Sequence, residues 1–149
     1  MPLTQNGHNG PLVRVGLPLP GGALAEAARQ LDAPVLISAN AFRRRWPRNR
    51  RHEMPFPGFR APARALDGLD VALDSAGFVA MALNNGYDWS VARYYDLVAA
   101  FGFSWHAAMD CCCEPEIAHD HDAVRLRLAE TARLYGLCRH EARTRGVDD

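Results

Sequence analysis

The segment between Ala107 and Asp122 is rich in side chains that can bind a metal or take part in catalysis. Its sequence, AAMDCCCEPEIAHDHD, holds three cysteines, two histidines and five carboxylates in sixteen residues. The candidate metal ligands are Cys111, Cys113, His119 and His121. Structural zinc usually takes two cysteines a few residues apart and a distant second pair, whereas these cysteines are adjacent. We therefore expect no metal ligands here, with a small cysteine-metal protein as an alternative. The cysteines can pack as small apolar residues, and HDHD can begin a solvated helix.

Two carboxylates each follow an apolar run. Asp74 follows VAL and precedes small residues and Phe78, and Asp110 follows FSWHAAM. Residues at the carboxyl ends of parallel strands share one edge of a sheet, so the two could divide proton transfer and ligand recognition between them. Small residues followed by an aromatic ring suit a planar ligand. The alternatives are a turn-forming Asp74 with a core Phe78, and a helix-capping Asp110.

A third candidate is the basic run RRRWPRNRR at residues 43–51. Its predicted nucleic-acid contacts are Arg43, Arg44, Arg45, Trp46, Arg48, Arg50 and Arg51. Arginines interleaved with an aromatic ring suit phosphate contacts and base stacking, although a solvated loop is the alternative.

Composition places the chain among globular proteins. Its 149 residues are 48% hydrophobic and 23% charged, which suits one domain over residues 1–149. Residues 1–75 carry a net charge of +4 and residues 76–149 a net charge of −4, a split that can orient a polyanion. Three of four cysteines are adjacent, which argues against a disulfide framework. No export signal or long apolar run is present, so we expect a cytoplasmic protein without a membrane partner.

Short apolar runs alternate with helical patterns along the chain. The predicted strands cover residues 11–18, 34–42, 69–78 and 103–109, and the predicted helices cover 21–34, 90–102 and 122–143. An Arg- and Pro-rich loop spans residues 43–64. We expect Asp88 or Ser90 to cap the second helix and Gly102 to end it. The expected buried faces are Leu24, Ala27, Ala28 and Leu31 in the first helix, and Val124, Leu128, Ala132, Tyr135 and Cys138 in the last.

This alternation predicts an α/β fold with parallel strands joined by right-handed crossovers. The first turn, GLPLPGG, has no Gly-rich phosphate fingerprint, which favours a barrel-type arrangement over a dinucleotide-binding fold. A complete (β/α)₈ barrel needs about 250 residues. We therefore predict about four (β/α) units of a TIM-type barrel, that is, a half or truncated barrel.

The stretch LDSAGFVAM (73–81) resembles the DSGGFQ motif of the tRNA-guanine transglycosylase (queuine tRNA-ribosyltransferase) superfamily, with Ala76 for the first glycine and Val79 for the glutamine. MDCCCEPEIA looks like that family's strand-end aspartate with a cysteine two positions on, and VRLRLAETARL is similar to its following helix. The run from YDWSVARYY to CCCEPEIA looks closer still to relatives that place 7-deazaguanines in DNA. The resemblance covers about residues 69–138 and concerns the family's N-terminal half.

The resemblance implies a (β/α)₈ barrel enzyme that exchanges guanine in nucleic acid for a 7-deazaguanine base. In that family an aspartate from the second half of the barrel attacks the sugar, and the incoming base displaces it. By this resemblance Asp74 would be the general acid/base near the departing or entering purine. DNA and tRNA both remain possible substrates, and the target base must be flipped out of its stack.

The same resemblance assigns five residues to the base. Phe78 would stack on the purine, and Asp110 would accept hydrogen bonds from its N1–H and amino edge. Ser75 and Gly77 would shape the slot, and Cys112 matches the family's cysteine near the base.

The family's nucleophilic aspartate and its zinc site would lie beyond residue 149, so we expect no cofactor in this chain. Activity of the chain alone is therefore left open. The alternatives are a non-catalytic purine or nucleic-acid binding module, and a truncated remnant acting with a partner chain. Four β/α units leave open sheet edges, which a homodimer or a missing C-terminal half would cover.

Overall fold

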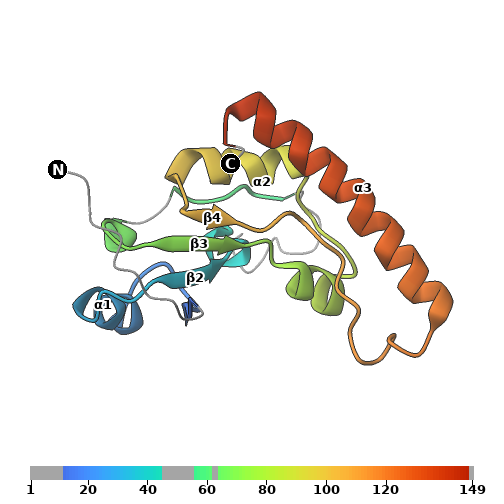
Figure 1. Cartoon of the computed structure of the whole chain (residues 1–149), viewed down its shortest axis with the longest axis horizontal. Coiled ribbons are helices and arrows are strands. Elements are labelled where there is room, and N and C mark those ends of the chain that lie inside the picture. Colours follow the sequence, from blue (N-terminus) through green and yellow to red (C-terminus); the bar gives the residue numbers. More distant parts are fainter. Residues whose placement is uncertain (1–11, 45–55, 62–63, 148–149) are drawn as a thin grey trace.

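Four parallel strands form a single sheet in the computed structural model, which describes residues 12–44, 56–61 and 64–147. The strands are β1 (Val15–Leu17), β2 (Val35–Ser38), β3 (Val71–Asp74) and β4 (Trp105–His106), in the order β1-β2-β3-β4 (Figure 1). Every neighbouring pair is parallel, so all four carboxyl ends lie at one edge of the sheet. The predicted α/β class and all four strands are confirmed, although each strand is shorter than its apolar run.

The middle strands are buried because their β-branched and leucine side chains pack under the helices. Val35 is opposite Val71 and Ile37 is opposite Leu73, and all four side chains belong to the core. Burying such side chains contributes about 1.5–3 kcal/mol each relative to exposure. This central pair fixes the register that carries Ser38 and Asp74 to the carboxyl edge.

Helix α1 (Ala23–Gln30) buries a different face from the one that we predicted. Ala25 and Ala28 face the core, whereas Leu24 and Leu31 are 52% and 77% exposed. The apolar pattern alone favoured the large leucines, but alanines let the helix approach its neighbours closely. Of the predicted face, only Ala28 is buried.

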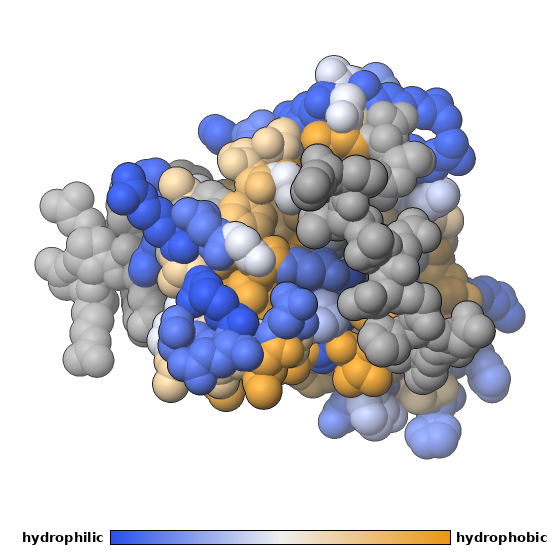
Figure 2. Space-filling model, turned by 60° about the vertical axis from the view of Figure 1, so that its left-hand side comes forward, coloured by the Kyte–Doolittle hydropathy of each residue, from blue (hydrophilic) through white to orange (hydrophobic). Residues whose placement is uncertain are grey.

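Figure 2 shows apolar side chains reaching the surface between hydrophilic ones on one side of the molecule.

Helix α2 (Val91–Phe101) begins and ends where its capping residues predict. The Ser90 hydroxyl accepts a hydrogen bond from the Arg93 N–H, and Gly102 ends the helix at φ 68°. Asp88 is not the cap; its carboxylate pairs with Arg43 instead.

Helix α3 (His121–Arg145) packs against α2 through its later turns, while its first turns extend past the carboxyl ends of the strands (Figure 1). Its buried residues, spaced four apart, are Leu134, Cys138 and Ala142. The predicted face holds at Cys138, which is buried, and in part at Val124, which is half-buried. It is wrong at Leu128 and Tyr135, which are 61% and 51% exposed, and at Ala132, which is exposed too. The prediction failed because α3 packs mainly on α2, through a face that carries Leu134, Cys138 and Ala142.

The connection from β2 to β3 contains two short 3-10 helices within its described parts, Ala39–Phe42 and Arg64–Leu66. Arg43 forms an isolated antiparallel bridge with Phe59, which draws the two sides of the predicted 43–64 loop together. Over the described residues, no helix combines the length and the apolarity that crossing a lipid bilayer requires.

Candidate functional site at the ends of β3 and β4

Asp74 ends β3 and shapes the turn that follows it. Its Oδ2 accepts a hydrogen bond of 3.0 Å from the N–H of Ala76. Ala76 has φ 68°, a left-handed conformation that costs a residue with a side chain about 1 kcal/mol and that the glycine of the DSGGFQ motif adopts freely. The turn-forming role of Asp74 is therefore present. The accompanying alternative of a core Phe78 is wrong, because that ring is 60% exposed.

Ser75, Gly77 and Asp110, which the resemblance assigned to one slot, lie in contact. The hydroxyl of Ser75 donates a 2.7 Å hydrogen bond to Oδ1 of Asp110. A Cβ placed on Gly77 would lie 2.3 Å from that same oxygen, so only glycine fits there. Parallel pairing of β3 and β4 produces this juxtaposition, because the segments leaving the two strands run side by side.

Tyr87 completes the cluster, and our reading of the sequence missed it. Its hydroxyl lies 3.0 Å from the carbonyl oxygen of Asp110, 3.3 Å from the backbone nitrogen of Asp110 and 3.3 Å from Oγ of Ser75. The N–H of Asp110 donates to Tyr87, and the tyrosine proton is shared between the two acceptors. Burial raises the pKa of Tyr87 well above its ordinary value, so its hydroxyl stays protonated at neutral pH. A π-helical turn, Val79–Leu83, separates Phe78 from the NNG sequence that precedes Tyr87.

The cysteines after Asp110 differ sharply in exposure. Cys111 is buried, Cys112 is half-buried and Cys113 is exposed, so exposure rises along the three residues and does not alternate between two sides. The N–H of Cys111 donates to the hydroxyl of Thr131 at 2.9 Å, which ties this segment to α3. Burial, then the charges of Glu114 and Asp110, raise the pKa of Cys112. Cys112 is thus a neutral thiol at pH 7 and suits packing better than nucleophilic attack.

A buried ion pair holds the next part of this segment. Glu114 is 7% exposed and its carboxylate lies 3.5 Å from the guanidinium of Arg127 on α3. Removing one partner of a fully buried pair typically costs about 3–5 kcal/mol, and we expect a smaller cost here because 22% of the Arg127 side chain is exposed. The sequence offered no periodic signal for this pair. It anchors the loop between Asp110 and α3.

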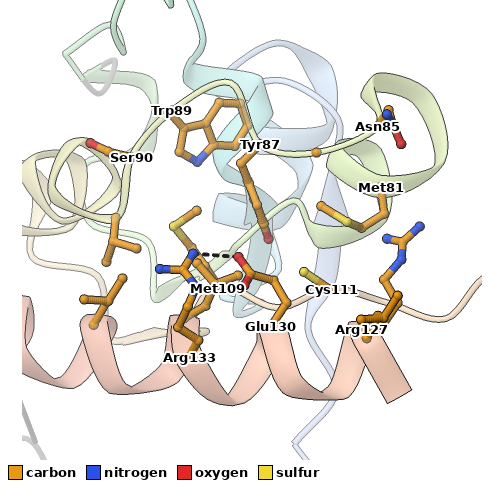
Figure 3. Close-up of a pocket in the computed structure, with 15 residues that line it drawn as sticks. Met81, Asn85, Tyr87, Trp89, Ser90, Met109, Cys111, Arg127, Glu130 and Arg133 are labelled. Atoms are coloured by element: carbon orange, nitrogen blue, oxygen red, sulfur yellow. Dashed lines mark hydrogen bonds and ion pairs between the residues drawn. The ribbon is translucent and has the colours of Figure 1, made fainter. Parts of the chain in front are cut away.

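A cavity of about 640 Å³ lies beside this cluster rather than at it. It opens between α3 and the segment from Met81 to Val91, with Tyr87 and Trp89 facing Glu130 and Arg133 across it (Figure 3). None of the residues assigned to the base by the resemblance lines it. Tyr87 belongs to both the cavity and the cluster, because its side chain lines the cavity while its hydroxyl forms hydrogen bonds with Ser75 and Asp110.

Of the predicted nucleic-acid contacts, Arg43 and Arg44 are described. Arg43 pairs with Asp88 and lies over the ring of Phe56 at 6.0 Å. Arg44 donates from Nε to the carbonyl oxygen of Phe59 at 3.1 Å. The other predicted contacts, Arg45, Trp46, Arg48, Arg50 and Arg51, lie outside the described residues.

The histidines and acidic residues of the HDHD sequence form the solvated N-terminus of α3. Asp120 caps the helix by accepting from the N–H groups of Asp122 and Ala123, both at 3.0 Å, and His119 and His121 are exposed. In the part of the chain that the structure describes, no three His, Cys, Asp or Glu side chains come together as a metal would need.

Comparison of the chain with protein-family models, curated proteins and solved structures gave no match. Its function is therefore inferred from the geometry at the ends of β3 and β4 and from the motif resemblance.

Proposed function

We propose that this chain is a transglycosylase-like protein, similar to queuine tRNA-ribosyltransferase. It supplies the purine pocket for a reaction in which guanine in nucleic acid is replaced by a 7-deazaguanine base. The observation that carries the proposal is the contact of Ser75 and Gly77 with the carboxylate of Asp110. These residues come from two separate motifs, and the resemblance assigned them to one base slot. The hydrogen bond spans 35 residues of sequence, so local turn chemistry alone does not account for it.

The carboxylate of Asp110 has the chemistry that a guanine edge needs. Ser75 bonds Oδ1, and Oδ2 has no partner among the described residues, so it can accept from the N1–H and amino group of a purine. Leaving such donors unpaired in a dry slot costs about 1–3 kcal/mol each. The exposed ring of Phe78 offers a stacking surface, and base–aromatic stacking contributes about 1–3 kcal/mol.

Asp74 suits the role of general acid/base in this proposal. One of its oxygens holds the turn through Ala76, while the other has no partner among the described residues. The proposal assigns no nucleophile to this chain.

The proposal includes the fold: the four-stranded sheet would be one sector of a TIM-type barrel. Strands that follow one another both in sequence and in the sheet, all parallel, are what a (β/α) barrel sector requires. The sheet ends in β1 on one side and in β4 on the other, and Trp105 of β4 is 51% exposed. A second copy or a complementary half-barrel would cover these edges.

Calorimetric titration with guanine and with 7-deazaguanine tests the base slot. We expect saturable binding by the wild-type chain and at least a tenfold loss in Asp110→Asn, which keeps the shape but presents an NH₂ group to the donors of the base. Asp67→Asn is the matched control, because Asp67 lies in the turn after Arg64–Leu66, away from the slot. Absence of binding by a folded wild-type chain, or equal binding by the Asp110 variant, would refute the proposal.

Release of labelled guanine from DNA or tRNA distinguishes an exchange enzyme from a non-catalytic purine-binding module. An exchange enzyme, alone or with a partner chain, releases the label when the new base is added. A non-catalytic purine-binding module binds the base without release.

A further inference from the structure

A second cavity, of about 420 Å³, lies at the carboxyl ends of β1 and β2. Leu17 and Ser38, the last residues of these strands, line it, and so does Val79 from the turn after β3. In (β/α) barrels, ligands bind at the face formed by the carboxyl ends of the strands. Val79 directly follows Phe78, the residue proposed to stack on the base, so the chain connects this cavity to the base slot within one residue.

The charged side chains that line this cavity are both arginines. They are Arg43 and Arg60, and Asn40 adds an amide; no carboxylate of the described residues lines the cavity. Asp88 pairs with Arg43, which fixes that guanidinium in place. One carboxylate against two guanidinium groups leaves a net positive charge.

Arg60 is the lining arginine that has no side-chain partner among the residues that the structure describes. Its backbone N–H donates to the carbonyl oxygen of Phe42 at 2.7 Å, which holds its backbone beside the cavity. Its guanidinium makes no ion pair or hydrogen bond with the described residues. The Ser38 hydroxyl oxygen, shielded from solvent, also lacks a partner in the described part of the chain. The cavity therefore holds a guanidinium that has no partner among the described residues, beside the amide of Asn40, and an anion with several acceptor oxygens would satisfy both.

We propose that this cavity binds a backbone phosphate of the nucleic acid whose base occupies the slot at Asp110. The inference rests on the proposed function, to which it adds the path of the sugar–phosphate chain past β1 and β2. A guanidinium presents a planar fork of N–H donors that matches phosphate oxygens, and Asn40 can add a further donor. Arg60, which was not among the predicted contacts, is the residue on which phosphate binding depends.

The test is the salt dependence of binding of a short fluorescein-labelled single-stranded oligonucleotide that contains guanine. Each phosphate contact contributes about 0.7 to the slope of log K against log salt for a single strand. Arg60→Gln should therefore lower the slope by about 0.7 and weaken binding about fivefold at 0.1 M salt. Arg125→Gln is the matched control: it removes the same charge from an 80% exposed side chain on the first turns of α3, and should leave the slope unchanged.

Two further measurements separate this inference from the proposed function. Free guanine should bind Arg60→Gln as it binds the wild type, because Arg60 does not contact the base slot. Inorganic phosphate should compete with the oligonucleotide for the wild type and much less for Arg60→Gln.

If guanine binds but Arg60→Gln keeps the full slope, the phosphate site is wrong and the base slot stands. If guanine fails to bind while the slope still depends on Arg60, the proposed base exchange is wrong and the phosphate site stands. An equal effect of Arg60→Gln and Arg125→Gln would mean that only net charge matters and would overturn the inference, as would a wild-type chain that binds no oligonucleotide.

Discussion

The hydroxyl of Ser75 donates a hydrogen bond of 2.7 Å to Oδ1 of Asp110, so the turn after β3 holds the carboxylate that follows β4. This bond orients the carboxylate before any ligand arrives. A carboxylate held in one rotamer loses less entropy on binding a base than a free one does.

Ser75→Ala should therefore weaken guanine binding by about tenfold and lower the free energy of unfolding by about 1 kcal/mol. Ser90→Ala is the control, because losing the α2 cap also costs about 1 kcal/mol without touching the site. Calorimetric titration and urea denaturation measure the two effects. Equal base affinity in the two variants would show that Ser75 serves stability alone.

Gly77→Ala should move Asp110, since the new methyl group would lie 2.3 Å from its Oδ1. We expect a loss of about 1–3 kcal/mol in the free energy of unfolding and loss of base binding. The same substitution at Gly136, in the interior of α3 with open space around it, should instead raise stability by about 0.5–1 kcal/mol. Urea denaturation of both variants decides this, and effects of the same sign would contradict the structure.

Tyr87→Phe should cost about 1–3 kcal/mol, because the buried N–H of Asp110 loses its acceptor. Base affinity should fall as well, as the segment carrying Asp110 loosens. Tyr135→Phe removes the hydroxyl of a tyrosine that is 51% exposed and should change stability by less than about 0.5 kcal/mol. Thermal and urea unfolding give the comparison; a neutral Tyr87→Phe would mean that the three-residue cluster is not cooperative.

Asp70 links the amino ends of three strands and predicts a pH effect. Arg14 pairs with it at 2.9 Å, and Ser104 hydrogen-bonds the same oxygen. Burial raises the pKa of Asp70, but these bonds outweigh it and lower that pKa below its ordinary value of 3.8. The stabilisation is therefore present above about pH 4 and is lost as the pH falls through the lowered pKa.

Asp70→Asn should reduce the free energy of unfolding by about 0.5–1 kcal/mol at pH 7, because the pair is partly exposed. The difference from wild type should shrink as the pH falls through the lowered pKa of Asp70. Asp67→Asn should show no such pH-dependent difference. Urea denaturation at a series of pH values between 2 and 7 measures this difference in the free energy of unfolding. A difference that grows as the pH falls would contradict the lowered pKa of Asp70.

Thiol labelling reports the packing of the cysteines. With iodoacetamide at pH 8, the exposed Cys113 should react first and the buried Cys111 and Cys138 only after unfolding. Cys112 should react slowly because burial and nearby carboxylates raise its pKa. Mass spectrometry of timed samples identifies the order, and Cys113→Ser should remove the fast phase. Early labelling of Cys138 would contradict the packing of α3.

The strands and the limits of α2 could be predicted because their signals are local. Short apolar runs produced β2 and β3, and Ser90 and Gly102 act on backbone groups within a few residues. The buried helix faces could not be predicted in the same way. Leu24 and Leu128 fit an apolar period, yet which side of a helix meets the sheet depends on where the strands end.

The part of the candidate site that follows from parallel strand pairing could be predicted. Asp74 and Asp110 both follow strands, and that rule brings their segments to one edge. Tyr87 could not be predicted, because it follows an NNG turn without any period and reaches Asp110 only by a tertiary contact. Whether a tyrosine in a turn faces solvent or the core depends on the path of the π-helical turn before it.

The position of the Tyr87 hydroxyl has a consequence for motion. Because it bonds both Ser75 and Asp110, the turn after β3 and the segment after β4 cannot separate unless the segment carrying Tyr87 also detaches. The N–H of Asp110 should exchange with deuterium when the Tyr87 hydroxyl moves away from it. Hydrogen exchange at that single amide therefore reports the detachment of the segment that carries Tyr87, and a bound base should slow it.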